Sequence, residues 1–456
     1  MPQRELRDPI HGFINREDVE EEIINSPVFQ RLRKIRQLAL ASLVYPGAVH
    51  TRFDHSIGAM HVAGLISDAV RLEPEEKRLV RLAALLHDIG HGPFSHVSEP
   101  VLEKYFDREK VNIEGKVQIH EKLTEAIIRE DEVLGHGLSP RDRERIIGIL
   151  NGTYGDSVLK HIVSGPLDAD KQAYLLRDSY FCGVKYGVFD LSRLSSTLAV
   201  QRDSDDRDLA INEDGVHALE QFVLAKYYMT TQVYRHKVRL ITDSMIGRAL
   251  DLGIREDGIE WLRKVYTYDG SRDYVREYKT WTDERLTNEI LSPRTPDGYA
   301  KSIFQNLTQR QLHKRIATYR IQEFDDPIAR KGLSELSSSD KIELEKRIGT
   351  YLSADHNLVI VNTFSIKSVR EQARNSEASI IVMGPDVEKP AIFEAKSALF
   401  RSIDEAVQEK YIEVYAPIKY IDDKQKKKLK SQYHGEIRSI LNDFMQPGPF
   451  EKEGAT

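Results

Sequence analysis

The stretch Leu85–His96 reads LLHDIGHGPFSH, and this stretch decides how the rest of the sequence is interpreted. It ends the segment Glu76–His87, in which apolar residues recur at spacings of three and four, as on one face of a helix. The pair His87 and Asp88 follows at the end of that helix, and glycines then interrupt it. Because neighbouring helical residues point about 100° apart, one cation can lie between the imidazole and the carboxylate.

Histidines are concentrated around this stretch, since six of the 15 lie between His50 and His96. A lone histidine beside an apolar face is most often a core residue, whereas three histidines and an aspartate within ten residues are typical of a metal site. His55 lies upstream in the string HTRFDHS, three residues after Arg52. A mixture of imidazole and carboxylate ligands favours an octahedral first-row metal with open positions over a closed structural zinc site.

A further ligand is expected in Leu167–Asp178, which reads LDADKQAYLLRD. Asp170, Tyr174 and Asp178 follow one another at spacings of four and form a polar stripe along a predicted helix. A solvated surface stripe is the alternative, but the apolar residues of this helix lie on other faces. We therefore expect Asp170 to bind metal, Lys171 to meet a phosphate, and Tyr174 and Asp178 to hold a sugar.

Three blocks of sequence, in order, resemble one known family. Arg52–Ser56 (RFDHS), His87–His96 (HDIGHGPFSH) and Asp168–Lys171 (DADK) are similar to the HD-domain metal-dependent phosphohydrolases. Within that family they most resemble the deoxynucleoside triphosphate (dNTP) triphosphohydrolases, including the catalytic core of the animal enzymes that combine a SAM and an HD domain. The resemblance extends from Asp8–Gly12 (DPIHG) to Thr363–Lys367 (TFSIK), and so covers most of the chain.

The resemblance implies a role for each matching residue. The implied metal ligands are His55, His87, Asp88 and Asp170. The implied catalytic residues are His91, His96, His120 and Glu121. The implied substrate contacts are Gln37, Leu38, Arg52, Lys171, Tyr174, Asp178, Lys226 and Tyr234. The implied cofactor is a divalent metal, and Fe, Mn, Mg, Ni and Zn all tolerate this ligand mixture.

The reaction that the resemblance implies is hydrolysis of a dNTP, as in dGTPases, to a deoxynucleoside and inorganic triphosphate. Relatives assemble as homotetramers around activating nucleotides, and the residues here that match their regulatory site are Arg4, Asn25, Gln30, Arg33, Arg310 and Lys314. Asn25 departs from the pattern, because the animal enzymes have an acidic side chain there that recognises guanine. An amide both donates and accepts hydrogen bonds, so the identity of any activating nucleotide stays open.

Two alternatives remain at this point. The first is an HD-type phosphodiesterase or nucleotidase, since metal ligands do not specify the leaving group. The second is a nucleotide-binding or nucleic-acid-binding protein, for which the lysine-rich run Lys424–Lys430 is the main support. That run is most simply a solvated helix face.

Composition sets the broader limits. The chain has 456 residues, 40% hydrophobic and 30% charged, and a formal net charge of −6, so nothing demands a polyanionic partner. A single cysteine, Cys182, excludes an intramolecular disulfide and fits a reducing compartment. No window approaches the roughly 20 apolar residues of a membrane-spanning helix. We therefore predict a cytoplasmic protein without a membrane partner.

The predicted fold is mainly α. We expect a helical HD-domain core over residues 1–322 and a smaller α+β lobe over 323–456, with a loose tail from Pro447. The patterns predict helices in Val28–Leu40, Ile57–Leu72, Val216–Tyr234 and Val238–Leu250, strands in Leu358–Phe364, Ser379–Met383, Ala391–Glu394 and Ile412–Tyr415, and a hairpin tip at Arg202–Asp208.

Overall fold

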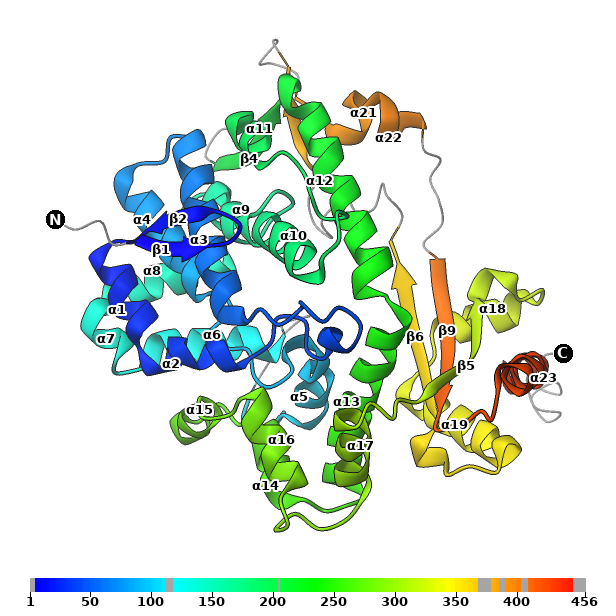
Figure 1. The fold of residues 1–456 in the computed structure, drawn as a ribbon. Coiled ribbons are helices and arrows are strands. Elements are labelled where there is room, and N and C mark those ends of the chain that lie inside the picture. The colour runs from blue at the N-terminus through cyan, green and yellow to red at the C-terminus, as the bar shows by residue number, and fades with distance from the viewer. Residues whose placement is uncertain are drawn as a thin grey trace, which may run out of the picture. The chain divides into compact units, whose positions relative to one another are not determined.

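The computed structural model describes residues 5–111, 118–203, 206–367, 379–384, 390–402 and 409–445. The fold is mainly helical, as predicted, and small sheets accompany the helices (Figure 1). The predicted tail from Pro447 and the residue Arg4 lie outside the described residues. Within the part of the chain that the structure describes, even the longest helices are too short or too polar to cross a membrane.

The chain forms two compact units, and each is discontinuous in sequence. The first comprises the described parts of residues 1–236, 259–296 and 369–406. The second comprises those of 237–258, 297–368 and 407–456. Residue 322, at the end of the predicted core, lies inside the second unit.

Helices α3 (Arg52–Ala69), α4 (Pro74–Leu86) and α10 (Ala169–Cys182) pack together in the first unit. Capping boxes fix where two of them begin, since α3 starts with Thr51 and Asp54 paired and α4 with Glu73 and Glu76 paired. The other helices of this unit are α1 (Asp18–Asn25), α2 (Pro27–Gln30), α5 (Glu99–Tyr105), α6 (Ile119–Glu130), α7 (Leu134–Gly137), α8 (Pro140–Asn151), α9 (Ser157–Val163), α11 (Leu191–Ser196), α12 (Val216–Tyr228), α14 (Glu260–Tyr266), α15 (Arg272–Tyr278), α16 (Asp283–Leu291), α21 (Phe393–Lys396) and α22 (Ala398–Ser402).

Two predicted helices differ from the structure. The helix predicted over Val28–Leu40 is wrong beyond its first turns, because α2 passes into a short 3₁₀ helix, Arg31–Lys34, and the backbone becomes extended at Ile35. The buried Arg31 side chain explains this break, because its guanidinium donates to the carbonyls of Ile89 and His91 instead of facing solvent. The helix predicted over Val216–Tyr234 ends as α12 at Tyr228 and continues as a π-helix, Met229–Tyr234.

The hairpin predicted around Arg202–Asp208 is confirmed by its paired strands, which extend to Asp203 and from Asp206, while residues 204–205 at its tip lie outside the described residues. Strands β3 (Leu198–Asp203) and β4 (Asp206–Asn212) pair antiparallel, and β7 (Ile381–Met383) pairs parallel to β4. Strand β8 (Ala391–Ile392) completes this sheet beside β7, and the strand predicted over Ala391–Glu394 is wrong at its last two residues, which begin α21. A second hairpin, β1 (Glu5–Asp8) with β2 (Gly12–Asn15), had no clear signal in the sequence.

The second unit is built on a three-stranded sheet in the order β5-β9-β6. Its strands are β5 (Lys314–Arg320), β6 (Ile360–Ile366) and β9 (Glu409–Ala416), and both pairings are antiparallel. Sequence patterns predicted β6 and β9 but not β5. Its helices are α13 (Lys237–Arg255), α17 (Tyr299–Thr308), α18 (Pro327–Ser334), α19 (Ser338–Leu352) and α23 (Asp423–Met445).

Candidate active site

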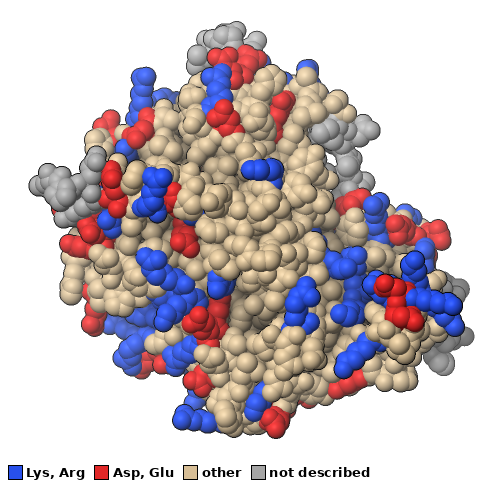
Figure 2. Space-filling view, viewed as in Figure 1, with Lys and Arg blue, Asp and Glu red and all other residues tan. Residues whose placement is uncertain are grey.

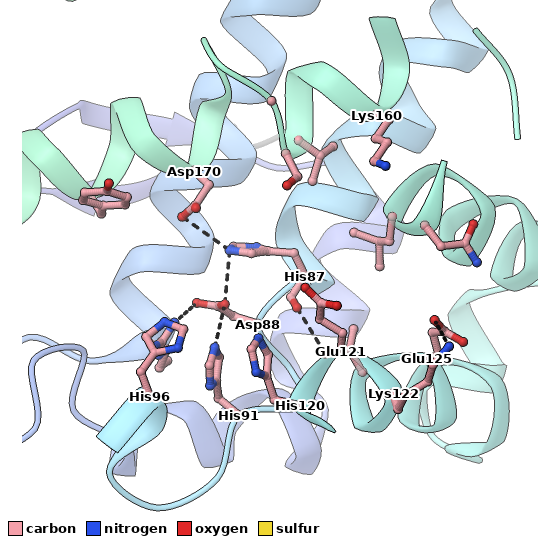
Figure 3. A pocket seen from close by; sticks show the side chains of 18 of the residues that line it. His87, Asp88, His91, His96, His120, Glu121, Lys122, Glu125, Lys160 and Asp170 are labelled. Atoms are coloured by element: carbon pink, nitrogen blue, oxygen red, sulfur yellow. Dashed lines mark hydrogen bonds and ion pairs between the residues drawn. The ribbon is translucent and has the colours of Figure 1, made fainter. Parts of the chain in front are cut away.

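The predicted metal ligands meet in the first unit, and three elements supply them. His55 lies in the first turn of α3. His87 and Asp88 follow the last residue of α4, and Asp170 lies in the first turn of α10 (Figure 3). The Nδ1 atom of His87 donates to the carbonyl oxygen of Ala84 at 2.8 Å. That bond fixes the ring so that Nε2 faces the other ligands, where it offers a lone pair once its proton is displaced.

Distances within this group fit a bound cation. His55 Nε2 lies 2.9 Å from Asp170 Oδ1 and 3.5 Å from Asp88 Oδ2. His87 Nε2 lies 3.3 Å from Asp88 Oδ1 and 3.6 Å from Asp170 Oδ1. With deprotonated imidazole nitrogens and carboxylate oxygens, all of these atoms would be acceptors, so either protons on the imidazoles or a bound cation must lie among them. The donor set therefore fits a divalent metal with mixed nitrogen and oxygen ligands.

The pKa shifts of these residues also favour a bound cation. Burial lowers the pKa of His87, but Asp88 and Asp170 outweigh burial and raise that pKa to about 9. Burial opposes ionisation of Asp88, yet Arg52 and the nearby histidines hold the pKa of Asp88 well below its usual range. His55 and His87 likewise hold the pKa of Asp170 low. The group thus concentrates negative charge in a buried place, which a cation neutralises.

Three other histidines form a second group on the cavity wall. Nitrogen atoms of His91, His96 and His120 lie within 4.8 Å of one another. The rings of His91 and His120 stack with centroids 4.0 Å apart. Behind them, Glu99 accepts from the backbone N–H of His120 at 3.1 Å and lies 3.2 Å from its Nδ1. Sequence reasoning paired His120 with Glu121 and missed Glu99, which is distant in sequence.

Burial lowers the pKa of His91 well below its usual value, and Arg52 and His120 reinforce this. Burial and Arg52 lower the pKa of His96 to about 3. Both rings are therefore neutral in this state. A polyanion bound beside them would oppose the lowering, because nearby negative charge stabilises imidazolium.

Gly90 and Gly92 allow the backbone between His87 and His96 to pack closely against its neighbours. A Cβ atom at Gly90 would lie 2.2 Å from the carbonyl oxygen of His120, and one at Gly92 would lie 2.1 Å from the hydroxyl oxygen of Tyr278. The backbone N–H of Gly90 also donates to Thr124 Oγ1 at 3.0 Å. The glycines in the motif thus serve close packing of backbone against its neighbours.

A cavity of about 620 Å³ opens onto both groups. Of the predicted site residues, those lining it are Gln37, Arg52, His87, Asp88, His91, His96, His120, Glu121, Asp170 and Tyr174. It also has lining residues that sequence reasoning missed, among them Lys122, Asn151, Lys160, His161 and Ser164, which come from α6, α8, α9 and the residue after α9. These had no motif to mark them.

Two predicted phosphate contacts take part in the architecture of the site. Arg52 donates to Asp88 Oδ2 at 2.6 Å and to Ser95 Oγ at 3.0 Å. Lys171 Nζ donates to Asp168 Oδ2 at 2.5 Å and to the carbonyl oxygen of Gly165 at 3.0 Å. Lys226, a third, lies on α12 and is half-buried.

The predicted sugar contacts form a network behind Tyr174. Asp178 accepts from the Tyr234 hydroxyl at 2.7 Å and pairs with His50 Nε2 at 2.7 Å. The rings of Tyr174 and Tyr234 meet edge to face, with centroids 6.1 Å apart. His50 is a participant that sequence reasoning missed. Leu38, predicted to line the same pocket, is buried with 5% of its surface exposed.

Predicted regulatory residues fall in both units. In the first, Asn25 ends α1, and Gln30 donates to the carbonyl oxygen of Ile24 at 2.7 Å and accepts from Arg33 Nε at 2.9 Å. The Arg33 guanidinium lies 3.4 Å from the centroid of the Phe53 ring.

In the second unit, Arg310 and Lys314 line a separate cavity of about 540 Å³. Four further cationic side chains line it, Lys237, Arg315, Lys426 and Lys430, together with Asp422 and Asp423. Burial and these neighbouring cations lower the pKa of Lys430. Figure 2 shows basic side chains gathered over α23 and β5. The lysine-rich run therefore contributes to a basic pocket, beyond the solvated face that the sequence suggested.

Comparisons with protein families agree with this geometry. Residues 52–157 match the model described as HD domain, and residues 189–432, more than half of the chain, match the model described as HD associated region. The chain therefore belongs to the HD-domain phosphohydrolases.

Individual relatives refine the comparison. An uncharacterised protein of Methanocaldococcus jannaschii is 30% identical over 381 residues, which are 80% of this chain and 74% of that protein. The deoxynucleoside triphosphate triphosphohydrolase SAMHD1 of Danio rerio is 30% identical over 348 residues, 69% of this chain and 55% of the relative. The chain thus spans about half the length of that enzyme.

Solved structures share the fold. A hypothetical protein from Aquifex aeolicus superposes with a TM-score of 0.68 at 28% identity, over 96% of this chain and 100% of that one. A phosphohydrolase from Bacteroides thetaiotaomicron superposes with a TM-score of 0.71 at 23% identity, over 91% of this chain and 99% of the other.

Proposed function

We propose that this protein hydrolyses dNTPs to a deoxynucleoside and inorganic triphosphate. The observation that carries the proposal is the shared cavity of about 620 Å³, which brings the ligand group of His87 and Asp170 together with Arg52, the three histidines and Tyr174. Its volume suits a nucleotide. Similarity to SAMHD1 over 69% of this chain supports the same substrate class.

His55, His87, Asp88 and Asp170 would hold the divalent metal. When bound, the cation polarises a phosphate oxygen and lowers the pKa of water. Arg52 would donate to the α-phosphate from its place between Asp88 and Ser95. Since Lys171 is held by Asp168, it would meet the phosphates as part of that pair.

His96, which lines the cavity, would donate a proton to the departing 5′-oxygen of the sugar once the bound triphosphate has favoured its imidazolium form. His91 and His120 would position the reacting phosphate and water, with Glu121 at the same wall. On the other side, the Tyr174 ring would pack against the deoxyribose and disfavour a 2′-hydroxyl. Asp178, held by His50 and Tyr234, would accept from the sugar's 3′-hydroxyl.

Product analysis tests the proposal. The protein is incubated with each dNTP and NTP under several divalent metals, and the products are separated by chromatography. Equal amounts of deoxynucleoside and triphosphate are expected, with little turnover of NTPs. Release of pyrophosphate with a monophosphate would contradict the proposal. Turnover of monophosphates alone would favour a nucleotidase.

We also propose that a nucleotide activates the protein and that a homotetramer is the active assembly. The basic cavity around Arg310 and Lys314 supports the first part, because its six cationic side chains suit a polyphosphate chain. Sedimentation with and without each dNTP tests both parts. An unchanged profile together with unchanged activity would remove the regulatory proposal.

A further inference from the structure

The segment Gly92–His96, here called the strap, carries His96 to the cavity in an unusual backbone conformation. Phe94 and Ser95 are consecutive non-glycine residues with φ angles of 60° and 52°. Such left-handed conformations are unfavourable for side chains with a Cβ atom and persist only where the surroundings enforce them. Something outside the strap must therefore hold it.

Asp283 supplies such a hold, although it lies far away in sequence. It is the first residue of α16, and only 8% of its surface is exposed. Its Oδ1 accepts from the backbone N–H of Phe94 at 2.7 Å, and its Oδ2 accepts from the backbone N–H of Arg36 at 2.9 Å. One carboxylate thus joins the strap to the segment that precedes α3.

A second tie leads from the strap to the metal ligands. Ser95 Oγ donates to the carbonyl oxygen of Arg36 at 3.1 Å and accepts from Arg52 Nε at 3.0 Å. Arg52 in turn donates to Asp88. The segment at Arg36 is therefore joined to the strap twice, through Asp283 and through Ser95. The tie through Ser95 also contacts Arg52, which lies next to the metal ligands.

Capping of α16 does not account for the Asp283 carboxylate. Thr282 is the N-cap residue, and its hydroxyl accepts from the backbone N–H of Arg285 at 3.2 Å. The Asp283 carboxylate accepts instead from Phe94 and Arg36. Thr282 therefore caps the start of α16, and the Asp283 carboxylate binds the strap instead.

We propose that Asp283 is a positioning residue for His96, because it holds the strap in the conformation that presents the imidazole to the reacting phosphate. This inference rests on the proposed function, in which His96 protonates the leaving oxygen. Asp283 itself touches no substrate.

The variant Asp283→Asn tests the inference. An amide offers one acceptor and one donor, so one of the two backbone N–H groups loses its partner. Turnover is compared between a dNTP, whose alkoxide leaving group needs a proton, and bis(p-nitrophenyl) phosphate, whose phenolate does not. We expect kcat for the dNTP to fall by about 30-fold with KM nearly unchanged, while turnover of the nitrophenyl ester changes little. Burial raises the pKa of Asp283 to about 6, so assays at about pH 8 keep the wild-type carboxyl ionised.

Glu284→Gln, at the exposed neighbouring position, is the matched control and should leave both activities unchanged. Equal losses on both substrates for Asp283→Asn would show a merely structural role and overturn the inference. If Asp283→Asn does not fold, Asp283→Glu, which keeps the charge but displaces the carboxylate, should give the same selective loss, and its failure to do so would overturn the inference.

A double-mutant cycle with His96→Ala needs only the dNTP. Because Asp283 acts through His96, adding Asp283→Asn to His96→Ala should lower kcat less than twofold further. Additive losses would overturn the inference while leaving the proposed function intact. A wild-type protein that hydrolyses no dNTP would instead refute the proposed function, and the inference would fall with it.

Discussion

Two groups of side chains face the same cavity and differ mainly in charge. The ligand group of His55, His87 and Asp170 includes one carboxylate, and that of Asp88 lies beside it. The other group consists of His91, His96 and His120 alone, with Glu99 behind it. In both groups the ligand-type atoms lie within 4.8 Å of one another.

The difference explains why we assign them different chemistry. Carboxylates at the first group give it negative charge, which favours a divalent cation and raises the pKa of His87 to about 9. The second group has no carboxylate among its three members, and although Asp88 Oδ1 also lies 3.4 Å from His91 Nε2, burial and Arg52 hold the pKa of His91 low. Neutral imidazoles beside an arginine suit phosphate oxygens and proton transfer. Histidine number alone therefore does not define a metal site.

Removing a carboxylate from the first group should have the largest effect. Asp170→Ala should lose the metal and lower kcat by roughly a thousandfold or more, since a bound cation contributes several kcal/mol to the transition state. Elemental analysis of the purified variant measures the metal, and product release measures kcat. Full metal content in Asp170→Ala would break the assignment of the two groups.

Removing a member of the second group should separate activity from metal binding. His120→Ala should retain its metal while kcat falls by about a hundredfold, because a group positioning the reacting phosphate is lost. The same elemental analysis and product assay apply. Loss of the metal from His120→Ala, at a level matching Asp170→Ala, would make the second group a metal site as well.

Metal affinity should depend on pH through the first group. His87 binds a proton below about pH 9, and a metal must displace that proton. Affinity should therefore rise by about tenfold per pH unit as pH increases towards 9 and level off above it. Titration of the metal-free protein with Mn²⁺ at several pH values checks this slope. A flat profile below pH 9 would place the metal away from His87.

The smallest effect concerns the residue behind the second group. Glu99→Gln should lower kcat by about tenfold with full metal content, because the weaker partner leaves the His120 ring less well oriented. Glu103→Gln, on the same helix, is a suitable control, and its kcat should match that of the wild type. If Glu99→Gln matched the wild type, the orientation of His120 would not depend on this carboxylate.

The parts of this site that could be predicted are those set by residues close together in the sequence. Short-range patterns identified His87 and Asp88 at the end of an apolar helix, and the spacing of Asp170, Tyr174 and Asp178 placed them correctly on α10. Helical period and residue chemistry suffice for such local statements. The hairpin of β3 and β4 was found in the same way.

What the sequence did not predict is held by long-range contacts. Glu99 behind His120, His50 behind Asp178 and Asp283 behind the strap have no motif of their own. Their roles appear only when distant segments meet. The break of the predicted helix at Arg31 has the same origin, since carbonyls of Ile89 and His91 take its guanidinium. Tertiary partners here override local propensity.

Gly90 and Gly92 place a limit on how this stretch can change. Each lies where a single added carbon would collide with a neighbouring backbone or side chain. In a library that randomises Leu85–His96, these two positions should tolerate replacement as poorly as His87 or Asp88, although for reasons of volume and not of reactivity. The motif therefore combines residues required for reactivity, such as His87 and Asp88, with glycines required for packing. A related protein that had lost its catalytic residues could still retain the two glycines.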